Sequence, residues 1–197
     1  MKKFSIKLTL FITVIAVCLV AFVGCNNTNK IDKFGEELEK NRNFEIEVTM
    51  VVPFLGTLVN TMKVDGNKTY NSEFMEEEEY TETIGDTVYT YKKSEDGVWT
   101  KDEGEKIVED EESTTESEDV IGLFKGDNYE YSKDKKAYVM KSDVKTDVMG
   151  GMKSVVIVFN DNGCTITGDL VENGIQVAVT MKITNVGKTK VELPEVK

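Results

Sequence analysis

Apolar and polar residues alternate along most of the chain beyond residue 43, and this period of two is typical of half-buried β-strands. The clearest case is residues 175–184, where five apolar side chains face one way and the intervening residues, including Lys182, face the other. Short turns such as Asp65-Gly66-Asn67 separate the alternating segments and predict antiparallel hairpins. The predicted strands cover residues 44–52, 57–64, 68–75, 79–84, 87–92, 98–101, 129–132, 137–141, 154–159, 164–170, 175–184 and 188–193.

Two segments depart from this pattern and predict helices. In residues 31–41, Ile31, Phe34 and Leu38 are spaced three and four apart, which predicts an amphipathic helix that packs on the sheet. Gly35 lowers the stability of this helix by about 1 kcal/mol relative to alanine. Residues 116–124 predict a short second helix. The predicted fold class is mainly β with some α-helix, in one domain over residues 31–197 that carries an insertion at residues 102–125.

The N-terminal 25 residues have the layout of a lipoprotein signal peptide. Three lysines precede an almost unbroken apolar run over residues 8–23, which ends at Gly24 and Cys25. We therefore expect a signal peptide over residues 1–24, diacylglycerol on the Cys25 thiol, and a lipidated tether over residues 25–30. A membrane-spanning helix is the alternative, but the run is shorter than the about 20 apolar residues that a bilayer needs. The predicted location is extracytoplasmic, anchored to the bacterial cell membrane by lipidated Cys25.

Composition narrows the function classes. Removal of residues 1–24 takes away three lysines and no acids, which moves the net charge from −12 to −15. Such an acidic chain excludes nucleic-acid binding and disfavours electrostatic docking to membranes apart from the acyl anchor. Histidine is absent, which removes Ser-His-Asp and Cys-His catalysis and HExxH zinc sites. With Cys18 in the signal and Cys25 lipidated, Cys164 has no disulfide partner.

Three further features suggest chemistry, but each has a simpler interpretation. Residues 102–119 hold ten acids and one lysine, yet they contain no calcium loop of the D-x-[DN]-x-[DN]-G-x5-E type. We expect a solvated loop there and an exposed edge or turn at the acidic residues 76–79. Cys164 has no imidazole to activate it and is interpreted as a small strand residue. The sequence Met149-Gly150-Gly151-Met152 is interpreted as a loop rather than a thioether copper site. No metal or cofactor is predicted.

The order of elements resembles the bacterial lipoprotein-carrier superfamily. An N-terminal helix precedes a long meander, a helical insertion and a second meander, and the chain closes on Gly-Lys-Thr-Lys-Val-Glu-Leu-Pro at residues 187–194. Tyrosine-rich hairpins around residues 89–91 and 97–99 add to the resemblance, which covers most of residues 31–194. This superfamily includes the outer-membrane lipoprotein chaperones and the mycobacterial glycolipid-binding lipoproteins. The resemblance implies a curved antiparallel half-barrel sheet covered by a few helices.

The resemblance also implies a cavity between sheet and helices that accepts acyl chains or another apolar ligand. The alternating apolar face would line either such a cavity or a dry core, because a sheet must bury one face to fold. Methionines within the strands suit an adaptable apolar site. The residues expected to line the cavity are Phe44, Ile46, Val48, Met50, Met62, Val64, Val177, Val179 and Met181.

The sequence favours a membrane-anchored lipoprotein that binds or carries a lipid or other apolar ligand. The alternative is a non-enzymatic envelope protein with a structural or sensing role, a filled core and a protein partner, for which residues 102–119 are the candidate contact. Enzymatic activity is not predicted, because no positioned set of catalytic residues can be recognised. Carboxylate pairs could hydrolyse glycosides, but Trp99 is the only tryptophan available for sugar stacking.

Overall fold

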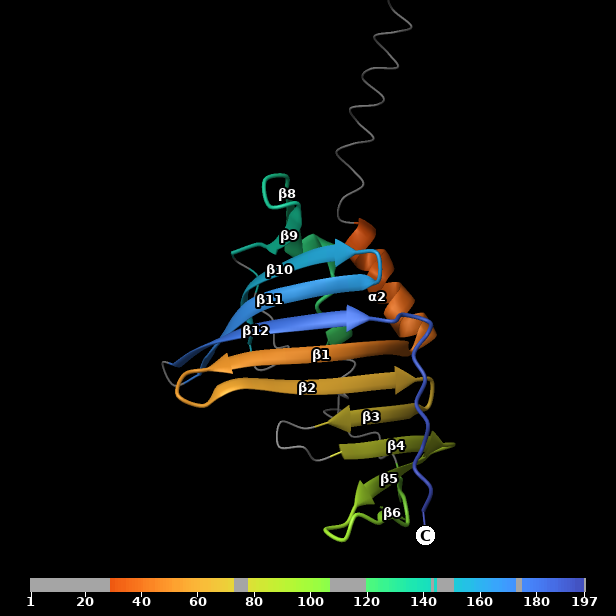
Figure 1. Cartoon of the computed structure of the whole chain (residues 1–197). Coiled ribbons are helices and arrows are strands. Elements are labelled where there is room, and N and C mark those ends of the chain that lie inside the picture. The colour runs from red at the N-terminus through yellow and green to blue at the C-terminus, as the bar shows by residue number, and fades with distance from the viewer. Residues whose placement is uncertain are drawn as a thin grey trace, which may run out of the picture.

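One antiparallel sheet forms the body of the protein, and an α-helix packs against it (Figure 1). The computed structural model describes residues 29–72, 78–106, 120–142, 144, 151–172 and 175–196. The helix is α2 (Asn29–Asn41), and a 3-10 turn, η1 (Gly126–Asn128), precedes the second meander. The strands are β1 (Asn43–Val52), β2 (Gly56–Asp65), β3 (Lys68–Ser72), β4 (Glu78–Ile84), β5 (Thr87–Lys93), β6 (Trp99–Lys101), β7 (Glu105–Lys106), β8 (Tyr129–Ser132), β9 (Ala137–Met140), β10 (Lys153–Asn160), β11 (Gly163–Glu172) and β12 (Ile175–Thr184).

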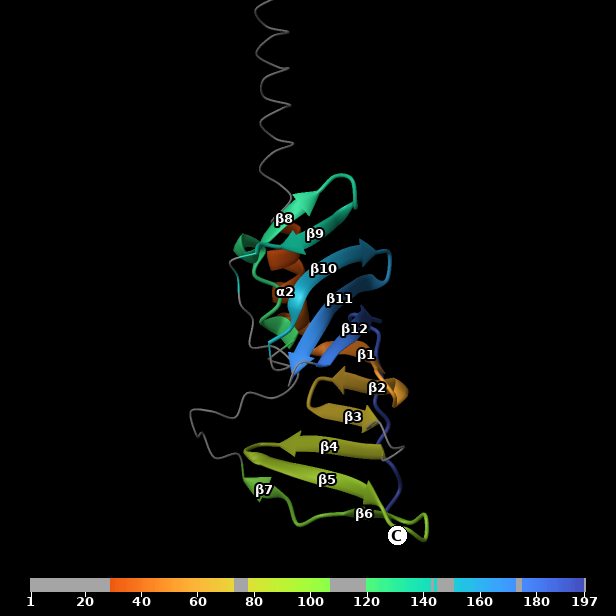
Figure 2. The same ribbon diagram turned by 90° about the vertical axis from the view of Figure 1, so that its left-hand side faces the viewer.

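The twelve strands are arranged in the order β6-β5-β4-β3-β2-β1-β12-β11-β10-β9-β8, with β7 paired to β5. β1 joins the two meanders because it pairs with both β2 and β12. Figures 1 and 2 show a curved, open sheet whose edges, β6 and β8, lie at opposite ends of the molecule. The predicted curved antiparallel architecture is confirmed, and in the described part of the chain one α-helix covers it.

The predicted elements agree with the observed ones apart from a few local differences. The predicted helix over residues 31–41 begins two residues earlier, at Asn29, so the last two residues of the expected tether belong to α2. The acidic segment contains a strand that was not predicted, β7, which pairs Lys106 with Thr87. Of the predicted helix over residues 116–124, residues 120–121 are helical, while residues 107–119 lie outside the described part.

α2 covers one face of the half-sheet formed by β1 and β8–β12. Cross-strand pairing stacks the apolar residues of this face, with Ile46 opposite Ile183 and Ile166 opposite both Met181 and Ile157. These side chains are buried, together with Ile31, Leu38, Phe44, Leu123, Tyr129, Val155 and Cys164. Burial of one sheet face under the apolar stripe of an amphipathic helix is the main source of stability here.

The same sheet face becomes polar in the other half. Val64 on β2 lies opposite Thr69 on β3. Thr81 on β4 lies opposite both Thr69 and Thr90 of the neighbouring strands β3 and β5. The hydroxyls of Thr69 and Thr81 are 2.6 Å apart and share a hydrogen bond. The apolar face of β1 therefore continues as a threonine face across β3–β5, where α2 does not reach.

Aromatic rings lie on the opposite face of that half. Tyr70 is opposite Tyr80, and Tyr80 is opposite the buried Tyr91. The ring centroids of Tyr70 and Tyr80 are 4.9 Å apart, and those of Tyr80 and Trp99 are 5.2 Å apart. Figure 2 shows α2 on one side of the sheet and the C-terminal segment, residues 185–196, on the other. The protein thus has two apolar layers, one on each face.

The C-terminal segment is extended but pairs as no strand, so the predicted strand over residues 188–193 is wrong. The backbone N–H of Thr189 donates to Asn43 Oδ1 (2.8 Å), and that of Val191 donates to Asp65 Oδ2 (3.2 Å). Asn43 Nδ2 also donates to Asp65 Oδ1 (2.8 Å), which links the two anchors. Because side chains of β1 and β2 satisfy these backbone groups, the segment crosses the strands instead of extending alongside one.

Tyr129 is a buried core residue whose hydroxyl group we expect to be unfavourable for stability. Its hydroxyl has no hydrogen-bond partner among the described residues, and burial, with the nearby Cys164 thiol as a smaller cause, raises its pKa well above the usual value. Tyr129→Phe should therefore leave the free energy of unfolding unchanged or raise it by about 1 kcal/mol. Urea denaturation measures this, with Tyr131→Phe as the exposed control. A marked loss of stability in Tyr129→Phe alone would mean that the hydroxyl is bonded in solution.

Candidate functional site

A groove of about 550 Å³ lies between α2 and the residues that precede η1, beside the start of β1 and the end of β2. Its floor is apolar and its rim is charged. The apolar lining residues are Phe44, Val64, Ile121 and Phe124, and the charged ones are Asp32, Glu36, Glu39, Arg42 and Lys125. A molecule in this groove would meet hydrocarbon on one side and charges of both signs on the other.

The periodicity of α2 determines which of its residues reach the groove. Leu38 is buried in the core, whereas Glu36 and Glu39 are spaced three apart on the flank of the helix that lines the groove. Arg42 follows the helix in the left-handed region (φ 42°), and its backbone N–H donates to the carbonyl of Leu38 (2.9 Å). This helix-ending turn places the only arginine of the chain on the groove rim.

The segment opposite α2 approaches the helix closely at Gly35. A β-carbon at position 35 would lie 2.8 Å from Phe124 Cβ and 3.2 Å from the Phe124 carbonyl oxygen, which is too close for an alanine. The rings of Phe34 and Phe124 are in contact, with centroids 5.1 Å apart. The Gly126 N–H donates to the Asp32 carboxylate (2.7 Å). Gly35, which weakens the isolated helix, therefore permits the contact that closes one wall of the groove.

The nine residues predicted to line a cavity do share one face of the sheet. Five of them, Phe44, Ile46, Val64, Val179 and Met181, are buried in the core, and Val48, Met50, Met62 and Val177 are partly buried at its margin. Phe44 and Val64 also line the groove. The other groove residues were not predicted to line a cavity, although the spacing of Asp32, Glu36 and Glu39 marks one flank of the predicted helix.

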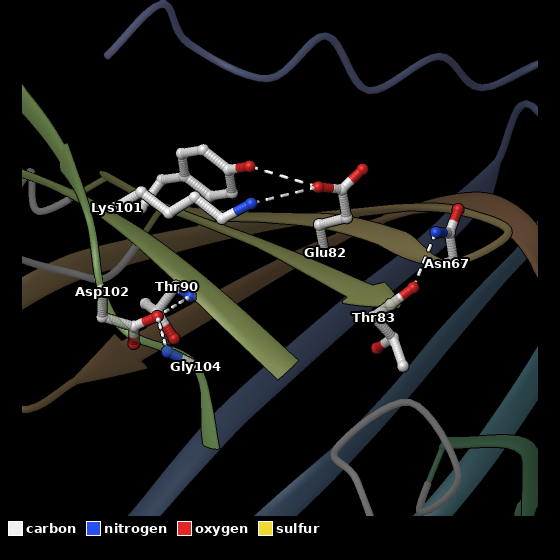
Figure 3. Close-up of polar contacts among 8 residues, drawn as sticks. Asn67, Glu82, Thr83, Thr90, Lys101, Asp102 and Gly104 are labelled. Carbon is white, nitrogen blue, oxygen red and sulfur yellow. Dashed lines mark hydrogen bonds and ion pairs between the residues drawn. The ribbon is translucent and has the colours of Figure 1, made fainter. Parts of the chain in front are cut away.

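The described part of the acidic segment is held by backbone contacts. The Asp102 carboxylate accepts the N–H groups of Thr90 (2.9 Å) and Gly104 (3.0 Å), as Figure 3 shows. These bonds, that of Thr90 first, lower the pKa of Asp102. Residues 107–119 lie outside the described part, as do residues 76–77 of the other acidic run. Its described end, Glu79, forms an ion pair with Lys92 at 2.9 Å.

A polar cluster on the aromatic face was not predicted from the sequence. Lys101 Nζ lies 3.7 Å from the Glu82 carboxylate, to which the Tyr91 hydroxyl donates a hydrogen bond of 3.2 Å (Figure 3). The same ammonium group lies 4.1 Å from the centroid of the Tyr89 ring, as in a cation–π contact. The pKa of Lys101 is raised, mainly by a hydrogen bond with the Tyr91 side chain. Since every member has a partner, the cluster explains how β4, β5 and β6 are held together.

Cys164 lies on β11, as predicted, and is fully buried. Burial raises the pKa of its thiol to about 12, so it is protonated at neutral pH. In the methionine-glycine segment over residues 149–152, Met152 is a buried core residue, and residues 149–150 lie outside the described part. Within the described ranges, no group of three or more cysteine, aspartate or glutamate side chains is placed to hold a metal ion.

Two comparisons, with protein-family models and with curated proteins, were informative only by their negative result. No protein-family model matches the chain, and no curated protein matches it significantly. Among the residues that the structure describes, no helix combines the length and the apolar character needed to cross a bilayer.

Proposed function

We propose that this chain is a membrane-anchored, extracytoplasmic lipoprotein that binds or carries a lipid or other apolar ligand without covalent chemistry, and that the groove beside α2 is the binding site. The observation that carries the proposal is the apolar floor under a charged rim. A groove of about 550 Å³ falls within the size range of small-ligand sites. The lipoprotein layout around Cys25 and the superfamily resemblance support the same function.

The chemistry of the groove favours an amphiphile over a purely apolar molecule. The rings of Phe44 and Phe124 and the aliphatic side chains of Val64 and Ile121 form the groove floor, where a hydrocarbon chain would contact them. Arg42 and Lys125 on the rim can pair with an anionic head group, and the glutamates can accept hydrogen bonds from hydroxyls or amines. The same site can therefore bury the hydrocarbon chain of the ligand and leave its head group in contact with water.

Native mass spectrometry of the mature, lipidated chain tests ligand binding. Covalent acyl groups on Cys25 remain under both native and denaturing conditions, so a bound ligand is the mass that is present only under native conditions. We expect one ligand per chain, lost on organic extraction and identifiable in the extract. Equal masses under both conditions, also after incubation with host lipids, would contradict the proposal.

A matched pair of substitutions tests the site. Glu36 lines the groove, whereas its neighbour Glu37 is exposed and does not. Glu36→Trp should fill the groove and remove the bound ligand, while Glu37→Trp, with the same change in size and charge, should retain it. Thermal unfolding of both variants checks that the fold is intact. Retention of ligand by both would locate the site elsewhere.

Recognition of an envelope protein is the second candidate function, and the β1–β2 hairpin favours it. At its tip, Phe54 is completely exposed, and Leu55 and Val51 are largely exposed. Residues 48–62 contain no charged residue in a chain that is 30% charged. Exposed apolar side chains gathered at one tip are typical of contact surfaces. The native mass experiment separates the two functions, since a filled core predicts no released ligand.

A further inference from the structure

Charge is distributed unevenly along the sheet. Residues 63–106, which contain β3–β7, have thirteen acids and six lysines, whereas residues 125–141, which contain β8 and β9, have five lysines and three acids. The sheet order places these groups at opposite edges. Among the described residues, the β8–β9 hairpin is therefore a basic edge of a strongly acidic chain, which the net charge conceals.

Three of these lysines lie in the turn that joins β8 to β9, residues 133–136, which we call the basic turn. Lys133, Lys135 and Lys136 are exposed, and none forms an ion pair with a described residue. The turn is held by pairing of Ser132 with Ala137 and by a hydrogen bond from the Lys135 N–H to Ser132 Oγ (3.3 Å). The three ammonium groups, with the exposed carboxylate of Asp134 among them, are therefore presented together on an ordered hairpin, and the turn has a net charge of +2.

The basic turn lies at the same end of the molecule as the start of α2 (Figures 1 and 2). A chain of ring contacts connects them. At the start of α2, Lys30 Nζ lies 4.6 Å from the centroid of the Phe159 ring. The centroids of Phe159 and Tyr138 are 5.6 Å apart, and those of Tyr138 and Tyr131 are 5.2 Å apart. Asn29, where α2 begins, is four residues from Cys25, a span of at most about 14 Å.

We propose that the basic turn docks on anionic lipid headgroups, so that the β8–β9 end of the sheet rests on the membrane and the β6 end points away from it. This inference rests on the proposed lipid anchor at Cys25, whose short tether keeps this end close to the bilayer. Tyr131, 38% exposed beside the turn, suits the headgroup region.

Local charge decides the docking because charges interact over only about 8 to 10 Å at physiological ionic strength. The acids of β3–β7 are too distant to oppose the contact, and their repulsion by an anionic surface favours the same orientation. The expectation from net charge, that only the acyl anchor contacts the membrane, is thereby modified. Each lysine near an anionic surface raises the ratio of docked to undocked molecules about fivefold. Reversing the charge of all three lysines should therefore lower this ratio by at least roughly 100-fold.

The fluorescence of the single tryptophan can report the orientation of the protein on the membrane. Trp99 begins β6, ten strand spacings from β8, or up to roughly 48 Å along the curved sheet. The experiment places the lipidated chain in phosphatidylcholine vesicles with or without phosphatidylglycerol and measures energy transfer from Trp99 to a headgroup-labelled acceptor lipid. We expect lower transfer on the anionic vesicles, and loss of this difference in 1 M salt, where screening shortens to about 3 Å.

The test variant is Lys133→Glu/Lys135→Glu/Lys136→Glu, for which transfer on anionic vesicles should rise to the neutral-vesicle value. The control is Lys40→Glu/Lys188→Glu/Lys190→Glu, which changes the net charge equally at exposed positions outside the turn and should behave like the parent chain. Transfer that is independent of lipid charge in a chain that floats with the vesicles would overturn the docking alone. A chain without acyl mass that fails to float would overturn the anchor and the docking together.

Discussion

Replacement of Gly163 by alanine is expected to lower the free energy of unfolding by about 3 kcal/mol, near the upper end of common single-site losses. Gly163 begins β11 opposite Thr184, at a positive φ of 146°. A β-carbon there would overlap the carbonyl oxygen of Ile183, which is backbone and cannot rotate away. The β11–β12 pair must open locally to accommodate it. Thermal and urea unfolding of the variant measure the loss.

Gly187→Ala is the matched control for this prediction. Gly187 also has a positive φ (72°), but a β-carbon there would meet nothing within 4 Å. Its cost should be limited to the backbone term of about 1–2 kcal/mol for a left-handed residue. If Gly163→Ala lost no more stability than Gly187→Ala, the close approach of β11 and β12 at this point would be wrong.

Phe44→Ala should destabilise the protein by about 3–5 kcal/mol, the usual cost of removing a buried phenylalanine side chain. Phe44 is 1% exposed and lies between the core under α2 and the floor of the groove. The variant removes contacts from both, so we also expect weaker retention of the ligand in native mass spectrometry. Stability is measured by urea denaturation with the chain stripped of ligand, which separates the two effects.

Phe54→Ala supplies the contrast within the same hairpin. Phe54 is completely exposed at the turn between β1 and β2, so its loss should change the free energy of unfolding by no more than about 0.5 kcal/mol. Its positive φ (71°) is equally unfavourable for alanine, which keeps the backbone term constant. Comparable losses in the two variants would contradict the assignment of Phe44 to the core.

Val179 is too deeply buried for a bulky substitution there to test ligand binding. Val179 is 1% exposed and lies between Met50 and Gly168 on the neighbouring strands. Val179→Trp would overpack this site and lose stability whether or not a ligand binds. Rim positions such as Glu36 therefore test ligand binding more cleanly than the predicted cavity residues do.

Much of the fold could be predicted from local pattern. The segments 44–52 and 175–184 alternate with a period of two, so the sequence of each segment shows which of its residues share a face. The spacing of Ile31, Phe34 and Leu38 likewise predicted α2. The failures were segments whose partners are distant in sequence. Residues 188–193 alternate like a strand, but Asn43 and Asp65 bind their backbone instead.

The sequence by itself determined most of the strands, the place of α2 and which residues of each strand share a face, because period and turn chemistry are local properties. Only the tertiary structure decided which face is covered, where the apolar layer changes sides between β2 and β3, and how Gly35 and Phe124 close the groove. Those features depend on register and contact between segments far apart along the chain. Alternation within a strand is the same whichever of its two faces becomes buried.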